Sequence, residues 1–208
     1  MASALTGSLV LDVPPDFHQL PVDDAIEDRM VAQRALVDAM GVSDARRREG
    51  LGLYVETLAR HVRDSRVAAS AFCLVELDGA PSTATLTVAL HAAGSRAGSL
   101  AASATDPTVL VLGTAEVLRR DGGYGHVGIE RISGRSLVVA TADRADPDGS
   151  ARHREVTVAV PLAEQGRIAL VAMASPDRVH WATYERLARQ VAGSVRVSTT
   201  EPTSQPTS

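Results

Sequence analysis

The chain of 208 residues contains no lysine, no asparagine and only one cysteine, Cys73. Without lysine, a standard phosphate-binding loop of the Walker A type is impossible, because that motif depends on a lysine. A single cysteine excludes an intramolecular disulfide and a zinc site built from cysteines. Aromatic residues make up only 3% of the chain, so few rings are available to stack on bases or sugars.

The charged residues exclude a further class of function. All 21 basic residues are arginines, and 25 acidic residues give a formal net charge of −4. A mildly acidic chain has no global electrostatic attraction to nucleic acid, so we expect no nucleic-acid partner. The abundance of alanine, arginine, valine and glycine is typical of a GC-rich genome and suggests an actinobacterial source.

Long apolar runs are also absent. No stretch reaches the roughly 18 apolar residues that span a bilayer. Residues 1–11 show neither the basic start nor the apolar run of a secretory signal. We therefore predict a cytoplasmic protein without membrane insertion.

The N-terminal part of the chain predicts a bent ribbon. Residues 8–13 and 17–22 are extended in pattern and flank Pro14 and Pro15, which cannot both lie in a central strand. An edge strand or a bent ribbon is therefore expected here.

Two helices are predicted next. The first covers residues 24–40, with acidic residues 23 and 24 at its start and Gly41 as its stop. The second begins at Ser43 or Asp44 and reaches about residue 63. Its apolar stripe has helical spacing and consists of Leu51, Tyr54, Val55, Leu58 and Val62.

Strand patterns dominate after residue 66. An apolar run over 67–77, turn residues 78–81 and alternation over 83–91 predict a hairpin with one buried face. Further strands are predicted over 125–132 and 137–141, and a second hairpin over 155–162 and 167–174. The apolar stretch 108–118, interrupted at Gly113, falls among these strands.

The last helix has the clearest local signals: Ser175 as N-cap, Pro176 at the first helical position and Asp177 in the first turn. Residues 195–197 are predicted to return to the sheet. Residues 198–208 are serine, threonine and proline with one glutamate and one glutamine, which predicts a disordered tail. Grouped helices and adjacent hairpins favour a single α+β domain over residues 1–197, an antiparallel β-sheet with helices packed on it.

The C-terminal third also carries a family resemblance. Its motifs are the sequence HREVTVAVP over residues 153–161, the apolar strand 168–173, Ser175-Pro176, Tyr184, and AGSVRV over residues 192–197; residues 125–131 add a matching strand. Together they resemble the Mog1/PsbP-like domains of actinobacteria, including the LpqN-type lipoproteins. The resemblance implies a Mog1/PsbP-like fold and a non-enzymatic interaction role. Because residues 1–11 show no signal-peptide pattern and no cysteine lies near them, we expect the chain to differ from the LpqN-type lipoproteins in this respect.

Few residues are candidates for a chemical site. The six histidines show no metal-ligand spacing, so neither a metal nor a cofactor is predicted, and no residue is assigned a catalytic role. His126, Arg131 and His153 are hypothesised to line a pocket, with exposed or half-buried strand positions as the alternative. Cys73 lies in an apolar run, which favours a buried, inert thiol over a nucleophile.

Two features suggest a contact with a partner. Arg46, Arg47 and Arg48 stand in the first turn of the second helix, where three cations oppose the helix dipole. They suggest a contact with an anion or a protein, with a solvated helix start as the alternative. Trp181, the only tryptophan, lies off the apolar stripe of the last helix and suggests an exposed anchor. A contact at the helix–sheet boundary fits it equally well.

The sequence therefore predicts a non-enzymatic protein-interaction or accessory domain that acts in the cytoplasm on an unidentified protein partner. The alternative is a small-ligand-binding protein, or an enzyme, with a pocket between helices and sheet. Homo-oligomer formation through an exposed sheet edge is a third hypothesis.

Overall fold

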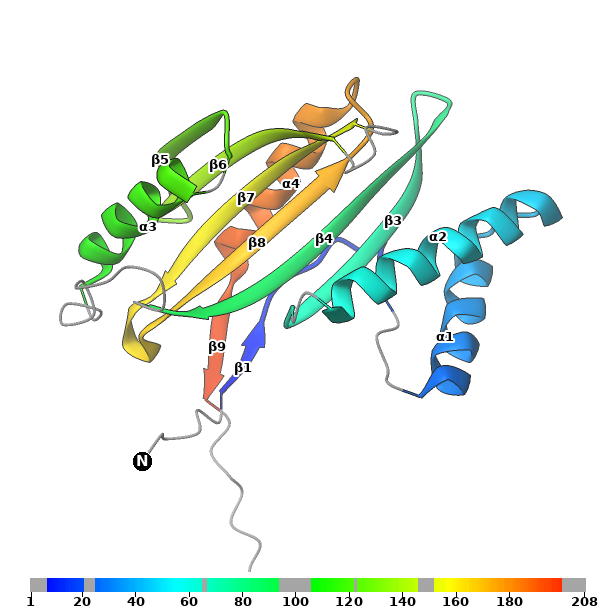
Figure 1. Ribbon diagram of the computed structural model, residues 1–208, viewed down its shortest axis with the longest axis horizontal. Coiled ribbons are helices and arrows are strands. Elements are labelled where there is room, and N and C mark those ends of the chain that lie inside the picture. Colours follow the sequence, from blue (N-terminus) through cyan, green and yellow to red (C-terminus); the bar gives the residue numbers. More distant parts are fainter. Residues whose placement is uncertain are drawn as a thin grey trace, which may run out of the picture.

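The chain folds around one large antiparallel sheet (Figure 1). The computed structural model describes residues 7–20, 25–64, 67–93, 106–121, 123–145 and 152–199. The sheet has seven strands in the order β2-β3-β4-β8-β7-β6-β5, and all neighbours are antiparallel. The strands are β2 (Phe17–Gln19), β3 (Ala69–Leu77), β4 (Ala80–Ala92), β5 (His126–Ile132), β6 (Arg135–Ala145), β7 (Arg152–Leu162) and β8 (Arg167–Ser175).

A separate two-stranded ribbon joins the two ends of the described chain. Strand β1 (Gly7–Val10) pairs antiparallel with β9 (Arg196–Thr199), with Leu9 opposite Val197. The predicted return of residues 195–197 to the sheet is thus a pairing with β1 and not with the large sheet. Residues 198 and 199, which we predicted to lie in the tail, belong to β9, and the remainder of that predicted tail, residues 200–208, lies outside the described residues.

Helices cover both faces of the sheet. They are α1 (Ile26–Ala39), α2 (Ala45–Asp64), α3 (Pro107–Asp121) and α4 (Trp181–Ser194), with a 3₁₀ turn, η2 (Ala163–Gln165), between β7 and β8. Figure 1 shows α4 behind the sheet and α3 in front of it. Alternation along the strands produces this division: Val139 and Val158 face α4, whereas Val138 and Ala159 face α3.

Three apolar clusters hold these layers together. The largest lies between α4 and the sheet, and a smaller one lies between α3 and strands β6, β7 and β8. The third joins α1 and α2 to β3, where fully buried Phe72 meets Val55 of α2. The prediction of an α+β domain with helices packed on an antiparallel sheet is confirmed.

Two tight turns fix the register of two hairpins. Asp78-Gly79 joins β3 to β4 and Ser133-Gly134 joins β5 to β6, and all four residues have positive φ. Two-residue turns with positive φ at both positions match the twist of a hairpin, and Asp-Gly is a preferred sequence for them. The first turn was predicted; the second was not, and β6 is therefore longer than expected.

The second helix begins as predicted. The backbone N–H of Arg47 donates to the side chain of Asp44 at 2.7 Å, the geometry of an N-cap. Gly41, with φ of +66°, follows α1 as its predicted stop. The acidic residues 23 and 24 that we placed at the start of α1 lie outside the described residues.

The apolar stretch 108–118, which stands among the predicted strands and was assigned to no element, forms the helix α3. Asp106 accepts a hydrogen bond from the N–H of Thr108 at 2.8 Å, and Pro107 occupies the first helical position. The buried residues recur with helical spacing: Leu110, Val111, Thr114 and Ala115. Gly113 therefore lies within a helix.

Candidate functional site

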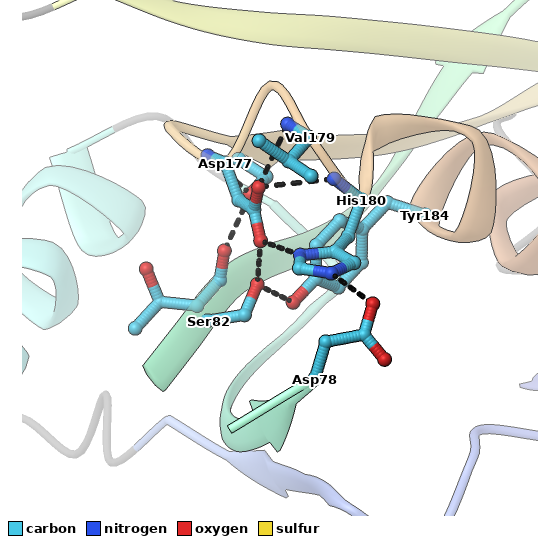
Figure 2. A network of polar contacts seen from close by, with 8 residues as sticks. Asp78, Ser82, Asp177, Val179, His180 and Tyr184 are labelled. Carbon is cyan, nitrogen blue, oxygen red and sulfur yellow. Dashed lines mark hydrogen bonds and ion pairs between the residues drawn. The ribbon is translucent and has the colours of Figure 1, made fainter. Parts of the chain in front are cut away.

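A polar network joins the β3–β4 turn to the start of α4 (Figure 2). Asp78 belongs to the turn and Ser82 to β4. Asp177 and His180 lie in the connection from β8 to α4, and Tyr184 lies in the first turn of α4. These side chains form one connected set of hydrogen bonds and ion pairs.

Hydrogen bonds from the side chains of Ser175 and Asp177 hold the connection before α4 in place. Ser175 Oγ accepts the N–H of Asp177 at 3.0 Å and donates to the carbonyl of Thr83 at 2.6 Å. Asp177 Oδ1 then accepts the N–H groups of Val179 and His180 at 2.9 and 3.0 Å. These bonds complete a turn before the helix, so α4 begins at Trp181 and not near Ser175 as predicted.

Asp177 stands at the centre of the network. Its Oδ2 atom lies 2.7 Å from His180 Nδ1 and accepts the Ser82 hydroxyl at 2.5 Å. The second ring nitrogen of His180, Nε2, lies 3.1 Å from Asp78 Oδ2. Ser82 Oγ is also 2.6 Å from the Tyr184 hydroxyl, so Tyr184 donates to Ser82 while Ser82 donates to Asp177. The exposed fractions of Ser82 and Tyr184 are only 2% and 1%.

These contacts shift the acidities of the network. Burial by itself raises the pKa of Asp177, but hydrogen bonds from Ser82 and from the backbone and ring of His180 outweigh burial and hold that pKa well below its usual range. Hydrogen bonds to Asp177 and Asp78 raise the pKa of His180. Burial raises the pKa of Tyr184 to about 12. The charged forms favoured here are the Asp177 carboxylate and the His180 imidazolium.

The order of groups in the network does not suit nucleophilic catalysis. A serine nucleophile needs a histidine between its hydroxyl and the acid, because the ring must take the hydroxyl proton. Here Asp177 lies between Ser82 and His180, and both ring nitrogens already contact carboxylates. These contacts link the tip of the β3–β4 hairpin to the start of α4, which is a structural role.

Cys73 packs in the same region and is not a nucleophile. Its exposed fraction is 1%, and burial raises the pKa of its thiol to about 11. A buried thiol with a raised pKa stays protonated at neutral pH. The buried, inert thiol was the interpretation favoured from the sequence. Among the described residues, no three histidine, cysteine or acidic side chains converge as metal ligands.

The predicted pocket residues do not come together. His126 lies on the α4 face of the sheet, whereas Arg131 and His153 lie on the opposite face. Arg131 pairs with Ser136 at one end of β6, and His153 pairs with Arg144 eight positions along that strand, about 26 Å away. The pocket hypothesis for these three residues is therefore wrong, and they occupy the strand positions that the alternative described.

Of the residues predicted to contact a partner, Trp181 is buried and the three arginines are exposed. Trp181 has an exposed fraction of 7% and belongs to the core between α4 and the sheet, so the exposed-anchor interpretation is wrong and the helix–sheet contact is right. Arg46, Arg47 and Arg48 are exposed in the first turn of α2, where Arg48 pairs with Asp38 of α1. Whether a partner contacts these arginines stays a prediction.

Sequence reasoning missed the network as a whole. The spacing of Asp177 and His180, three residues apart, was available as a local signal. Ser82 and Asp78 come from a hairpin about a hundred residues earlier, and only the pairing of β4 with β8 brings them to α4.

The network makes stability depend on pH. A raised histidine pKa stabilises the fold fully below the unfolded value of about 6.5 and less as pH rises through the folded pKa. A depressed aspartate pKa stabilises above about pH 3.9 and is lost in acid. We expect the contribution of the network to be largest between about pH 4 and 6.5 and to decline toward pH 8.

Urea unfolding at about pH 5.5 and about pH 8 measures this decline. His180→Gln is expected to flatten it, because glutamine does not titrate. His126→Gln, an exposed histidine outside the network, serves as the matched control. An equal slope in both variants would assign the pH dependence to other groups.

Comparisons with known proteins give only a weak likeness. No family model matches this chain, and no curated protein matches it. The crystal structure of LpqN, involved in cell envelope biogenesis of Mycobacterium tuberculosis, is similar with a TM-score of 0.42 and 13% identity, over 94% of this chain and 87% of that chain. The resemblance found in the sequence thus has a weak structural counterpart. Within the described residues, no helix is both long and apolar enough to cross a membrane.

Proposed function

We propose that this chain is a non-enzymatic protein-interaction domain whose contact surface is formed by α1 and α2. The observation that carries the proposal is a groove of about 350 Å³ between the two helices, lined in part by Met30, together with further exposed apolar side chains on the same helices. Ile26, Met30 and Val31 of α1 and Leu53 of α2 have exposed fractions of 63%, 44%, 66% and 68%. We call these four residues and the groove the α1–α2 surface.

The α1–α2 surface contrasts with the polar network. In the network the hydroxyl, carboxylate and imidazole groups already bond to one another, so little remains for a substrate. On the α1–α2 surface, apolar area stays in contact with water, at a free-energy cost of about 25 cal/mol per Å². Contiguous exposed apolar area on a soluble domain marks contact sites. We propose the cytoplasm as the location, in line with the sequence.

Site-specific photocrosslinking in the native host tests the proposal. A photoreactive amino acid at Leu53 is expected to give a discrete covalent adduct with a protein. The same substitution at Glu116, exposed on α3, is the matched control and is expected to give none. Equal labelling at both positions, or no adduct at Leu53, would contradict a contact on this surface.

A second candidate function rests on an apolar pocket of about 320 Å³ on the α4 side of the sheet. It lies where the chain after β1 passes over β3 and β4, a different place from the predicted pocket between helices and sheet. Its walls include Leu11, Val13, Phe17, Ala71, Leu86 and Val88, and Gln19 is the exposed polar side chain. The lining contains no charged side chain, so the matching ligand is an uncharged apolar chain.

Binding of the neutral probe N-phenylnaphthylamine measures this activity. Ala71→Leu fills the pocket floor and is expected to weaken probe binding at least about tenfold, which corresponds to about 1.4 kcal/mol. Ala182→Leu, on the exposed side of α4, is expected to leave binding unchanged. Circular dichroism verifies that both variants are folded. Unchanged binding by folded Ala71→Leu protein would remove this candidate.

A further inference from the structure

We infer that a groove between α3 and strands β5, β6 and β7 is a binding site for a small apolar molecule that carries one carboxylate. The groove has a volume of about 380 Å³, which lies in the range of sites for small ligands. It is separate from the α1–α2 surface and from the apolar pocket over β3 and β4, so the inference goes beyond both proposed functions. We call it the α3–β5 groove.

The walls of the α3–β5 groove are mainly apolar. They come from the first turns of α3, from β5 and β6, and from the end of β7, and they include Val111, Leu112, Ile129, Leu137 and Pro161. Leu112 and Ile129 have exposed fractions of 57% and 43%. Apolar side chains that gather around a groove gain free energy when a ligand removes them from water. The floor of the groove therefore suits an apolar ligand.

An arginine without a partner stands at the rim of this groove. Arg131 is exposed and forms no hydrogen bond or ion pair with any residue that the structure describes. It is the cross-strand partner of Ser136, which lines the groove, and such partners have Cβ atoms about 4.5–5.5 Å apart. It also points to the same face of the sheet as Ile129, two residues earlier in β5. Its guanidinium offers the paired N–H donors that hold a carboxylate.

The other charged groups near the groove are engaged or lie farther from this rim. The guanidinium of Arg135 donates to three backbone carbonyls at the end of α4, on the other face of the sheet. Asp106 accepts the N–H of Thr108 at the start of α3. Glu164 is exposed in η2, beyond the end of β7, and two strand spacings of about 10 Å separate β7 from β5. We therefore place the carboxylate of the ligand at Arg131 and its apolar part toward β7.

Other classes of ligand match the groove less well. Nucleic acid is held by several basic groups along its backbone, whereas the described residues at this rim offer one unpaired guanidinium. A phosphate monoester carries close to two negative charges, more than one guanidinium neutralises. An uncharged ligand would fill the floor and leave Arg131 without a partner. One carboxylate on an apolar body matches both the floor and the rim.

Isothermal titration calorimetry of the full chain with octanoate tests the charged contact, and 1-octanol is the uncharged probe. We expect octanoate to bind the wild-type chain, and Arg131→Gln to weaken this binding at least about tenfold. Arg186→Gln, at an exposed arginine of α4, is the matched control and is expected to change nothing. 1-Octanol is expected to bind at least about tenfold more weakly than octanoate, and equally to the wild-type chain and to Arg131→Gln.

Filling the groove gives a second test. Thr108 is exposed and lines the groove, so Thr108→Trp is expected to occupy the floor and to weaken octanoate binding at least about tenfold. Thr57→Trp, at an exposed threonine of α2, is the matched control and is expected to leave the affinity unchanged. Ala71→Leu, which fills the apolar pocket over β3 and β4, is also expected to leave it unchanged. Circular dichroism verifies folding of every variant.

The outcomes separate this inference from the proposed functions. The inference is overturned if octanoate does not bind the wild-type chain, or if folded Arg131→Gln protein binds octanoate as tightly as the wild type does. Loss of octanoate binding in Ala71→Leu but not in Thr108→Trp would assign the ligand to the pocket over β3 and β4 and would also overturn it. None of these results changes what the Leu53 photocrosslink is expected to capture, so the α1–α2 surface and the α3–β5 groove stand or fail independently.

Discussion

Replacing Asp177 with alanine is expected to lower the free energy of unfolding by about 3 kcal/mol or more. Its carboxylate accepts the N–H groups of Val179 and His180, the Ser82 hydroxyl and the His180 ring. Alanine leaves the buried Ser82 hydroxyl without its acceptor, and water reaches that atom poorly because Ser82 is only 2% exposed. Each buried polar group left without a partner costs about 1–3 kcal/mol.

Two companion variants make the Asp177 measurement specific. Asp177→Asn keeps one acceptor oxygen and loses the charge, so an intermediate loss is expected in urea unfolding. Asp78→Asn removes the charge of a side chain that is 92% exposed and keeps a residue that tolerates the positive φ of this turn, so a much smaller loss is expected. If Asp177→Ala and Asp78→Asn destabilised the protein equally, the central role of Asp177 would be refuted.

Trp181→Ala is expected to destabilise the protein by about 3–5 kcal/mol, the range found when a buried aromatic residue is truncated. Trp181 is 7% exposed and packs in the cluster between α4 and the sheet. Alanine would leave a cavity beside the first turn of α4, close to Tyr184. The substitution would therefore affect partner binding only by destabilising the fold, whatever surface the partner uses.

Val179→Ala is the matched control for Trp181. Val179 stands two residues earlier and has an exposed fraction of 86%, so its truncation should change the free energy of unfolding by less than about 0.5 kcal/mol. Chemical denaturation of both variants measures the difference. A loss of less than about 1 kcal/mol for Trp181→Ala would mean that its site in the core collapses around alanine.

The predictability of the candidate site differs sharply from that of the fold. Asp177 and His180 were visible as a nearby pair, but nothing in the sequence links them to Ser82. That link requires β4 to pair with β8, a contact between segments about ninety residues apart. Likewise, His126 of β5 pairs with Thr141 and His153 of β7 pairs with Arg144, and these two positions of β6 point to opposite faces of the sheet. The sequence does not contain this register.

The sequence by itself determined the features that depend on neighbouring residues. Asp78-Gly79 favours positive φ at two consecutive positions and so closes a hairpin, and the Asp44 side chain reaches the N–H of Arg47 three residues on. Alternation in 83–91 and helical spacing in 51–62 identified a strand and a helix, because each pattern reports which side of one element avoids water.

Only the tertiary structure decided the features in which distant groups compete. The apolar stretch 108–118 forms a helix whose buried residues Leu110, Val111 and Ala115 lie on one face. That face packs against β6 and β7, and Asp106 caps the start of the helix. Asp177 forms hydrogen bonds with Ser82 and His180 in the turn before α4, so the helix begins at Trp181. The Trp181 side chain is buried in the core. In each case the deciding free energy comes from burial against residues far away in the chain, which no local window of sequence contains.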